Sequence, residues 1–317
     1  MPSPEDSATR ESLPALVVIL GPTAVGKTEI ALQLAGRLDG EIVSADSRLF
    51  YRGMDIGTAK PSLEERQRVP HHLIDVAEPD ETWSLAQFQE RACQAIAEIH
   101  ARQRLPFLVG GTGQYLRAVT QGWEPPAVPP DPRLRRALED WALQIGKDGL
   151  HARLASLDPE AAQAIDPRNQ RRTVRALEVI LSTGQRFSAQ RQRQPSPYRL
   201  LQIGLTRPRA ELYARIDVRI DAMLANGLVA EVRGLLERGY DPALPSLSAI
   251  GYRQIAAHLL GQISLEEAVI QIRRDTRTFV RRQANWFKPD DPQIHWFTPG
   301  AQTIEDILNM IRKWQSQ

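Results

Sequence analysis

Residues 21–28 read GPTAVGKT, the eight-residue pattern of a phosphate-binding loop, between an apolar run at 15–20 and a helical pattern at 29–35. The glycines allow a tight backbone turn, so successive amide N–H groups converge on a small volume that suits an anion. Lys27 adds a mobile positive charge, and Thr28 adds a hydroxyl that can bind Mg²⁺. The loop therefore predicts a site for a phosphate group, whereas the compound and the reaction stay open.

Asp46 is the second candidate for chemistry, because it closes the short apolar run EIVSAD at 41–46. Such a run predicts a buried strand, and sites in open parallel sheets lie at the carboxyl edge that Asp46 would occupy. Glu41, Asp55 and Asp75 are less well placed, since only Asp46 both ends a strand and lies one strand away from the loop. From position alone, Asp46 is equally suited to act as a general base, to cap a turn or to bind Mg²⁺.

Arginines supply the third set of candidates. Arg215 and Arg219 share one face of a helical pattern with Glu211 and Asp217 nearby, so a solvated, charge-compensated face is the simpler interpretation of Arg215 alone. Two other stretches are strongly basic, with eight arginines against two acids between 166 and 199 and six basic residues against one acid between 271 and 288. Such residues provide sequence-independent affinity for phosphates, and the second stretch adds amides and an aromatic ring that suit unstacked RNA bases. We expect RNA contacts from both stretches, with a solvated helix face as the alternative for each.

Composition limits the class of protein. The 317 residues include 42% hydrophobic residues, enough for a proper core, and 40 basic residues nearly balance 38 acidic ones. The single cysteine, Cys93, excludes an intrachain disulfide and a cysteine-based zinc site, and fits a reducing compartment. Residues 1–14 lack the apolar segment of a signal peptide, and no stretch reaches transmembrane length. We therefore expect a cytoplasmic protein with no membrane partner.

Strand and helix patterns alternate up to residue 122 and resume after 199, which predicts an α/β fold, a P-loop core built on a parallel sheet with helices on both faces. Strands are expected at 15–20, 41–46, 73–76, 107–109, 200–205 and 294–297, and helices at 29–35, 84–104, 115–120, 209–226, 228–238, 252–260 and 265–287. The stretch 48–61 has no clear period and predicts an irregular loop over the carboxyl edge. A glycine-rich turn at 110–113 brings further backbone amides to that edge.

A proline-rich stretch at 123–132 interrupts this alternation, and the patterns from 133 to 184 are helical throughout. We therefore expect a mostly helical insertion domain over 123–198. The core would then comprise 15–122 and 199–317, preceded by a disordered tail at 1–14.

Several of these stretches together resemble one family, the tRNA dimethylallyltransferases, also called tRNA isopentenyltransferases. The resemblance extends from residue 15 to residue 297. YRGMDIGTAKP at 51–61 is its most specific block. The other blocks are GPTAVGKT at 21–28, SADS at 44–47, PHHLID at 70–75, LVGGTGQYL at 108–116, RRTVRALEV at 171–179, AIGYRQ at 249–254 and RRQANWFK at 281–288.

The resemblance implies transfer of a dimethylallyl group from dimethylallyl diphosphate to N6 of the tRNA adenosine on the 3′ side of the anticodon. It implies that Asp46 is the general base, that Arg215 and Lys27 assist catalysis, and that Mg²⁺ binds at Thr28. The implied diphosphate ligands are Gly21, Pro22, Thr23, Ala24, Val25, Gly26, Lys27, Thr28 and Arg215. The implied contacts with the tRNA anticodon stem-loop are Asp46, Ser47, Arg48, Leu49, Thr112, Arg171, Arg172, Thr173, Val174, Arg175, Ala249, Ile250, Gly251, Tyr252, Arg253, Gln254, Arg281, Arg282, Gln283 and Trp286. Leu49 departs from the family, since many members have Gln there.

Two other functions stay open at this point. An adenylate isopentenyltransferase would act on free AMP, ADP or ATP, but such a substrate needs neither the basic stretches nor a helical insertion. A small-molecule kinase with a P-loop is the other, although the strand at 107–109 runs into Gly110, Gly111 and Thr112 without an acidic residue. We expect a monomer with no obligate protein partner.

Overall fold

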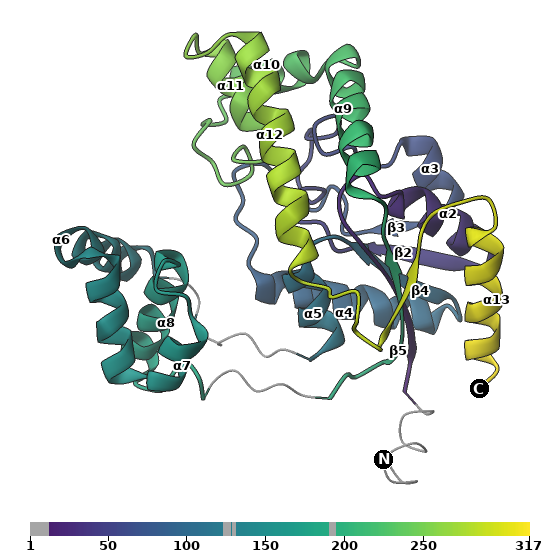
Figure 1. Cartoon of the computed structure of the whole chain (residues 1–317), viewed down its shortest axis with the longest axis horizontal. Helices are drawn as coiled ribbons and strands as arrows, with labels where there is room; N and C mark the ends of the chain where they lie inside the picture. The colour runs from purple at the N-terminus through teal and green to yellow at the C-terminus, as the bar shows by residue number, and fades with distance from the viewer. Residues whose placement is uncertain (1–12, 123–127, 129–130, 190–194) are drawn as a thin grey trace. The chain divides into compact units, whose positions relative to one another are not determined.

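The structure is a computed structural model that describes residues 13–122, 128, 131–189 and 195–317 (Figure 1). Two compact units divide the chain. Met1–Thr120 and Ser196–Gln317 form the first, and Gln121–Pro195 form the second. The expected tail at 1–14 lies almost wholly outside the described residues.

The first unit is built on a parallel sheet of six strands in the order β3-β2-β4-β1-β5-β6, so the predicted α/β core is confirmed. The strands are β1 (Ala15–Leu20), β2 (Gly40–Ser44), β3 (His71–His72), β4 (Leu105–Gly110), β5 (Arg199–Leu205) and β6 (Ile294–Phe297). All six residues of β4 are buried, as expected for a central strand that is covered on both faces. The register pairs Leu20 of β1 with Gly110 of β4 and with Gly204 of β5, so these three strands end at the same edge.

The edge of the sheet differs from the prediction. A strand was expected at 73–76, but β3 is the preceding pair His71–His72. Leu73 and Asp75 have φ angles of 61° and 56°, in the left-handed region that ends an extended strand. The helix α3 (Leu63–Arg68) was not predicted, although Ser62 and Glu65 form the capping box that marks its start.

Helices surround the sheet, and their limits follow local signals. The helix α4 begins at the Ser84–Gln87 capping box that its sequence predicts. α9 packs on α10 and α12, α11 packs on the same two helices, and Figure 1 shows these four helices as one group. The helices of this unit besides α3 are α2 (Lys27–Arg37), α4 (Leu85–Ala101), α5 (Gly113–Thr120), α9 (Arg209–Ala225), α10 (Leu228–Glu237), α11 (Tyr252–Leu259), α12 (Leu265–Ala284) and α13 (Thr303–Gln315).

The second unit is helical and has a small core of its own. Its helices are α6 (Pro132–Leu157), α7 (Pro159–Ala164) and α8 (Gln170–Thr183). Gly146, with φ 76° and ψ 161°, divides α6 into two straight pieces. Leu150, Leu154 and Leu177 are buried in the core between these helices. In the residues that the structure describes in either unit, no helix is long and apolar enough to cross a lipid bilayer.

Candidate active site

The phosphate loop connects β1 to α2 at the carboxyl edge of the sheet. Gly26 (φ 109°) precedes the first turn of α2, where glycine accepts the left-handed conformation without strain. A Cβ at Gly21 would lie 2.6 Å from the Leu205 carbonyl oxygen, so only glycine fits against β5. Val25 is buried in the core, whereas Thr28 at the start of α2 is exposed. The loop is therefore fixed on one side and open on the other.

Two arginines hold the outer rim of the loop. Arg207 donates from Nε to the Val25 carbonyl oxygen at 3.0 Å, and Arg215 donates from Nε to the Ala24 carbonyl oxygen at 2.8 Å. Arg207 is in turn paired with Glu211 one turn along α9. The structure thus places Arg215 against the loop, in contact with its main chain.

Lys27 folds back on its own loop. Its ammonium donates to the carbonyl oxygens of Gly21 at 2.9 Å and Pro22 at 2.8 Å. Burial lowers the pKa of Lys27 to about 8, the charge of Asp46 raises it, and the charge of Arg219 lowers it. Lys27 therefore interacts electrostatically with Asp46 and Arg219. A bound phosphate could replace the carbonyl oxygens of Gly21 and Pro22 as its hydrogen-bond acceptors.

Asp46 follows β2 at the same edge. The Ala45 amide donates to the Val109 carbonyl oxygen at 2.8 Å, which continues the pairing of β2 with β4 up to the residue before Asp46. Asp46 Oδ1 accepts the Arg48 amide at 3.0 Å, and its Oδ2 accepts no hydrogen bond within the described part of the chain. The carboxylate therefore has one oxygen that fixes its orientation and one oxygen available to a substrate.

The predicted RNA contacts next to Asp46 continue this loop. Arg48 donates from Nη1 to the carbonyl oxygens of Pro245 at 2.9 Å and Ser246 at 3.2 Å, and so ties the loop to the segment before α11. Ser47 and Leu49 are partly exposed beside it.

Arg219 is a site residue that its sequence context indicated only as a neighbour of Arg215 on one helix face. It lies one turn after Arg215 on α9, and its Nη2 donates to the Thr58 carbonyl oxygen at 3.3 Å. Burial lowers the pKa of Arg219, and the charge of Asp46 raises it. Lys27, Asp46 and Arg219 therefore form one charged cluster, for which the only sequence signal was the four-residue spacing from Arg215.

The end of α12 packs on the phosphate loop. Gln283 is 7% exposed, accepts the Thr23 amide on Oε1 at 2.9 Å and donates from Nε2 to the Gly111 carbonyl oxygen at 3.1 Å. Trp286 lies beneath the Arg117 guanidinium, 5.5 Å from the ring centre, and its carbonyl oxygen accepts from Arg117 at 2.6 Å. The predicted RNA contact of Gln283 would require its amide to leave both of these partners.

The segment 249–254 is largely internal. Ala249, Gly251, Tyr252 and Gln254 are buried, Ile250 is partly buried, and only Arg253 is exposed. Gln254 caps α11 and donates to Asp275 at 3.0 Å, and Arg253 pairs with the same carboxylate. The segment therefore joins α11 to α12, and among its side chains Arg253 is the one exposed to solvent.

The second unit carries the segment 171–175. Arg171 and Arg172 are exposed, whereas Thr173 and Val174 are buried in the core of this unit. Arg175 pairs with the buried Glu178 at 2.9 Å. Burial alone would raise the pKa of Glu178, but hydrogen bonds from Arg175 and Arg135 hold it below its ordinary value. Arg171 and Arg172 are thus the two solvent-exposed residues of this segment.

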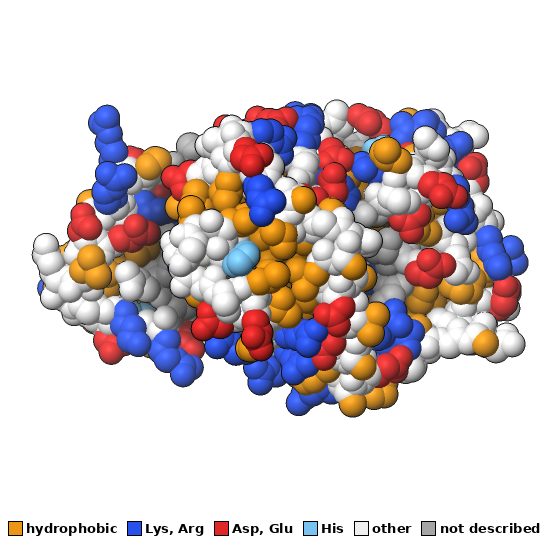
Figure 2. Space-filling model, turned by 90° about the horizontal axis from the view of Figure 1, so that it is seen from above, with side chains coloured by type: hydrophobic (Ala, Val, Ile, Leu, Met, Phe, Trp, Pro, Cys, Tyr) orange, Lys and Arg blue, Asp and Glu red, His pale blue; other side chains and the backbone are white. Residues whose placement is uncertain are grey.

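A basic groove runs between α9 and α12. Its cavity of about 460 Å³ is lined by Tyr213, Ile270, Arg273, Arg274, Arg277 and Arg281. The Arg277 guanidinium lies 5.3 Å from the centre of the Tyr213 ring and pairs with Asp217 at 2.6 Å. In Figure 2, which views the molecule from the side of α10 and α11, Lys and Arg side chains gather along the lower margin of the central part.

Together, the sheet order and the site geometry define a parallel α/β protein in which the loop between β1 and α2 and the carboxylate after β2 lie at the same edge of the sheet. The sequence model of the IPP transferase family matches residues 49–290, and the chain belongs to this family.

Similar proteins and solved structures support the same family. The chain is 56% identical over 299 residues to a tRNA dimethylallyltransferase of Roseiflexus sp. (strain RS-1), covering 94% of this chain and 98% of that protein. A tRNA dimethylallyltransferase of Thermomicrobium roseum is 52% identical, covering 89% of this chain and 85% of that protein. The full-length tRNA isopentenylpyrophosphate transferase of Bacillus halodurans matches with a TM-score of 0.71 and 44% identity, over 95% and 97% of the two chains. A eukaryotic dimethylallyltransferase acting on tRNA matches with a TM-score of 0.79 and 26% identity, over 95% and 77%.

Proposed function

We propose that the protein transfers the dimethylallyl group of dimethylallyl diphosphate to N6 of the tRNA adenosine on the 3′ side of the anticodon. Identities above one half to proteins named for this activity support the reaction class. The observation that carries the assignment of the site is the cluster of Lys27, Asp46 and Arg219 beside the phosphate loop. It combines an anion site with an adjacent carboxylate.

Asp46 acts as the general base. The lone pair of adenine N6 is delocalised into the ring, so N6 is a poor nucleophile until a carboxylate accepts a hydrogen bond from its N–H group. N6 forms a bond to the allylic carbon, the bond from that carbon to the diphosphate oxygen breaks, and the N6 proton passes to Asp46. The Arg48 amide on Oδ1 leaves Oδ2 for this proton.

The phosphate loop and its two basic partners stabilise the departing diphosphate. In this proposal the loop amides, the Lys27 ammonium and the Arg219 guanidinium bind the negative charge that grows as the bond breaks, with Lys27 leaving the carbonyl oxygens of Gly21 and Pro22, and Arg215 fixes the loop from outside. The loss of one such contact typically raises the barrier by about 3 to 4 kcal/mol.

Thr28, an exposed residue with a hydroxyl oxygen at the start of α2, is suited to hold a magnesium ion that is shared with the substrate. No group of three or more acidic, His or Cys side chains that could hold a metal occurs among the described residues, so the diphosphate and water would provide the remaining oxygen ligands. When bound, Mg²⁺ would neutralise part of the diphosphate charge.

The tRNA would contact the basic groove, Arg281 and Arg282 at the end of α12, and Arg171 and Arg172 of the second unit. Arginine forks bind phosphates in two-point geometry, and the partly exposed Trp286 offers a ring for base stacking. We infer that the anticodon stem-loop is the part bound, because the target adenosine must leave its stack to reach Asp46. We further propose that the protein acts in the cytoplasm as a monomer.

Incubation with radiolabelled dimethylallyl diphosphate tests the function. We expect label on an unmodified tRNA transcript, none on AMP, no consumption of ATP, and loss of label on chelation of Mg²⁺. Label on AMP would favour an adenylate isopentenyltransferase, and phosphate transfer from ATP would favour a kinase. The Asp46→Asn variant should bind tRNA normally and lose turnover, and a normal single-turnover rate would exclude Asp46 as the base.

A further inference from the structure

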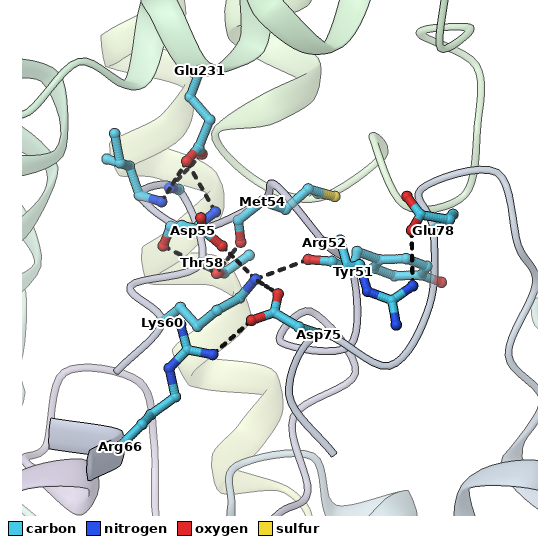
Figure 3. Close-up of polar contacts among 12 residues, drawn as sticks. Tyr51, Arg52, Met54, Asp55, Thr58, Lys60, Arg66, Asp75, Glu78 and Glu231 are labelled. Carbon is cyan, nitrogen blue, oxygen red and sulfur yellow. Dashed lines mark hydrogen bonds and ion pairs between the residues drawn. The ribbon is translucent and has the colours of Figure 1, made fainter. Parts of the chain in front are cut away.

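The segment 51–61 is an irregular loop at the carboxyl edge of the sheet that two sets of polar contacts hold from opposite sides (Figure 3). The backbone runs through turns, and Ala59 lies in the left-handed region with φ 48°. A loop without its own ladder of hydrogen bonds must be stabilised by side chains. A loop held in this way is suited to position a neighbouring side chain.

Lys60 forms the first set of contacts. Its side chain is 1% exposed, and its ammonium donates to the Tyr51 carbonyl oxygen at 2.9 Å, to Asp55 at 2.5 Å and to Asp75 at 2.6 Å. Asp75 also accepts from Arg66 at 2.6 Å. All three ammonium protons therefore have partners, and the loop is closed on the side of β3 (Figure 3).

Glu231 of α10 forms the second set. Its Oε2 accepts the amides of Asp55 at 2.9 Å and Ile56 at 2.7 Å, and its Oε1 accepts the amide of Gly57 at 3.2 Å. Tyr252 of α11 donates its hydroxyl to Oε1 at 2.5 Å. One carboxylate thus takes three successive backbone amides, as an anion does at a helix N-terminus.

The packing around Glu231 leaves little freedom. Tyr252 is fully buried, and a Cβ at Gly57 would lie 2.5 Å from its ring. Placing the Glu231 carboxylate among four hydrogen-bond donors costs desolvation energy that an apolar contact would avoid. The contact instead fixes the orientation of the loop backbone at 55–57, directly before Thr58.

Thr58 transmits this orientation to the charged cluster. Its hydroxyl donates to the Met54 carbonyl oxygen at 2.6 Å, which closes the turn, and its own carbonyl oxygen accepts from Arg219. Arg219 in turn interacts electrostatically with Lys27 and Asp46. Hydrogen bonds at both ends of the 55–58 turn, joined by its backbone, therefore connect Glu231, outside the cluster, to the Arg219 guanidinium inside it.

We propose that Glu231 is a positioning residue for the transfer reaction, acting through the 55–58 turn and the Thr58 carbonyl oxygen to hold the Arg219 guanidinium at the leaving diphosphate. The inference rests on the proposed function, because it takes Arg219 as a ligand of the diphosphate. Loss of the carboxylate frees the turn, and Arg219 then loses the acceptor that orients it. We expect kcat/KM for dimethylallyl diphosphate to fall and the affinity for tRNA to stay unchanged.

A double-mutant cycle tests the proposal. It combines Glu231→Gln with Arg219→Gln and measures kcat/KM for dimethylallyl diphosphate at saturating tRNA. Glu231→Gln alone should lower kcat/KM about tenfold, and in the Arg219→Gln background its further effect should be less than about twofold. Glu267→Gln is the matched control, because Glu267 also accepts a backbone amide, at the start of α12, and lies outside this network. It should leave kcat/KM unchanged.

The outcomes separate the two claims. If Arg219→Gln is fully active, the role of Arg219 fails and the inference fails with it. If Arg219→Gln is impaired but the two effects multiply, Glu231 acts independently of Arg219 and the inference alone is overturned. Tyr252→Phe removes the hydroxyl that donates to Glu231 and also meets the Gly57 backbone in the same turn. This smaller change keeps the test available should Glu231→Gln not fold. We expect Tyr252→Phe to lower kcat/KM by less than Glu231→Gln does, and to have no effect in the Arg219→Gln background. A decrease in kcat/KM that persists in that background would overturn the proposal.

Discussion

Gly110 at the end of β4 allows a quantitative test of how the sheet positions Asp46. A Cβ added there would lie 2.6 Å from the carbonyl oxygen of Ala45 and 2.8 Å from its Cβ. Ordinary contact begins at 3.4 Å, so the Gly110→Ala substitution must displace the Ala45 oxygen by about 0.8 Å. Ala45 is fully buried and directly precedes Asp46, so the carboxylate must move with it.

Both stability and rate should respond to Gly110→Ala. Overpacking of a well-packed core costs about 1 to 3 kcal/mol, which lowers Tm by about 2 to 5 °C in a protein of this size. A misplacement near 1 Å costs about a hundredfold in rate, so single-turnover prenylation of tRNA should slow by about thirty- to a hundredfold. Circular dichroism melting and a radiolabel quench assay measure the two effects. A variant with the parental single-turnover rate would refute the argument that β4 sets the position of Asp46.

Three other predictions concern stability and pH. Gly234→Ala in α10, where an added Cβ meets nothing within 4 Å, should stabilise the protein by about 0.5 to 1 kcal/mol in a denaturant titration, and a loss of stability would contradict the packing described here. Since burial lowers the pKa of Lys27 to about 8, calorimetric affinity for inorganic diphosphate should fall as pH rises through 8, and Lys27→Arg, which stays charged, should abolish that fall. Burial alone would raise the pKa of Glu41, but hydrogen bonds from Arg102 and His72 lower it to about 2. The stabilisation is therefore present above the ordinary value of 4.5 and lost as pH falls toward 2, and Glu41→Gln should cost about 2 kcal/mol at neutral pH and flatten this acid limb.

Features that depend on neighbours in sequence could be predicted. The phosphate loop, its flanking strand and helix, and the capping box of α4 all lie within windows of fewer than about 12 residues and were predicted. The capping box of α3 lies in an equally short window but was missed. The position of Asp46 also followed, because a strand end defines an edge of a parallel sheet. The short edge strand was misplaced, because the left-handed conformation of Leu73 has no signal in its side chain type.

Contacts between distant segments could not be predicted. Gln283 meets Thr23 across 260 residues, and Arg215 meets Ala24 across 191. Arg215 and Arg219 share a helix face in the sequence, and only the packing of α9 against the loop decides that Arg219 enters the charged cluster. Burial of Tyr252 likewise depends on Glu231 and Gly57, which belong to other parts of the fold.

The sheet order has a consequence for the geometry of the reaction. Because β4 lies between β1 and β2, the strand that ends in the phosphate loop and the strand that leads to Asp46 are two strand spacings apart, about 10 Å. In the reaction proposed above, a carboxylate oxygen of Asp46, adenine N6, the allylic carbon and the departing oxygen, each about 3 Å from the next, would fill that span in a line. A site built on adjacent strands would be too narrow for this row of atoms, and a third spacing would hold the proposed base out of reach of N6. The width of the proposed site is therefore set by β4, through the hydrogen-bonded spacing of the sheet.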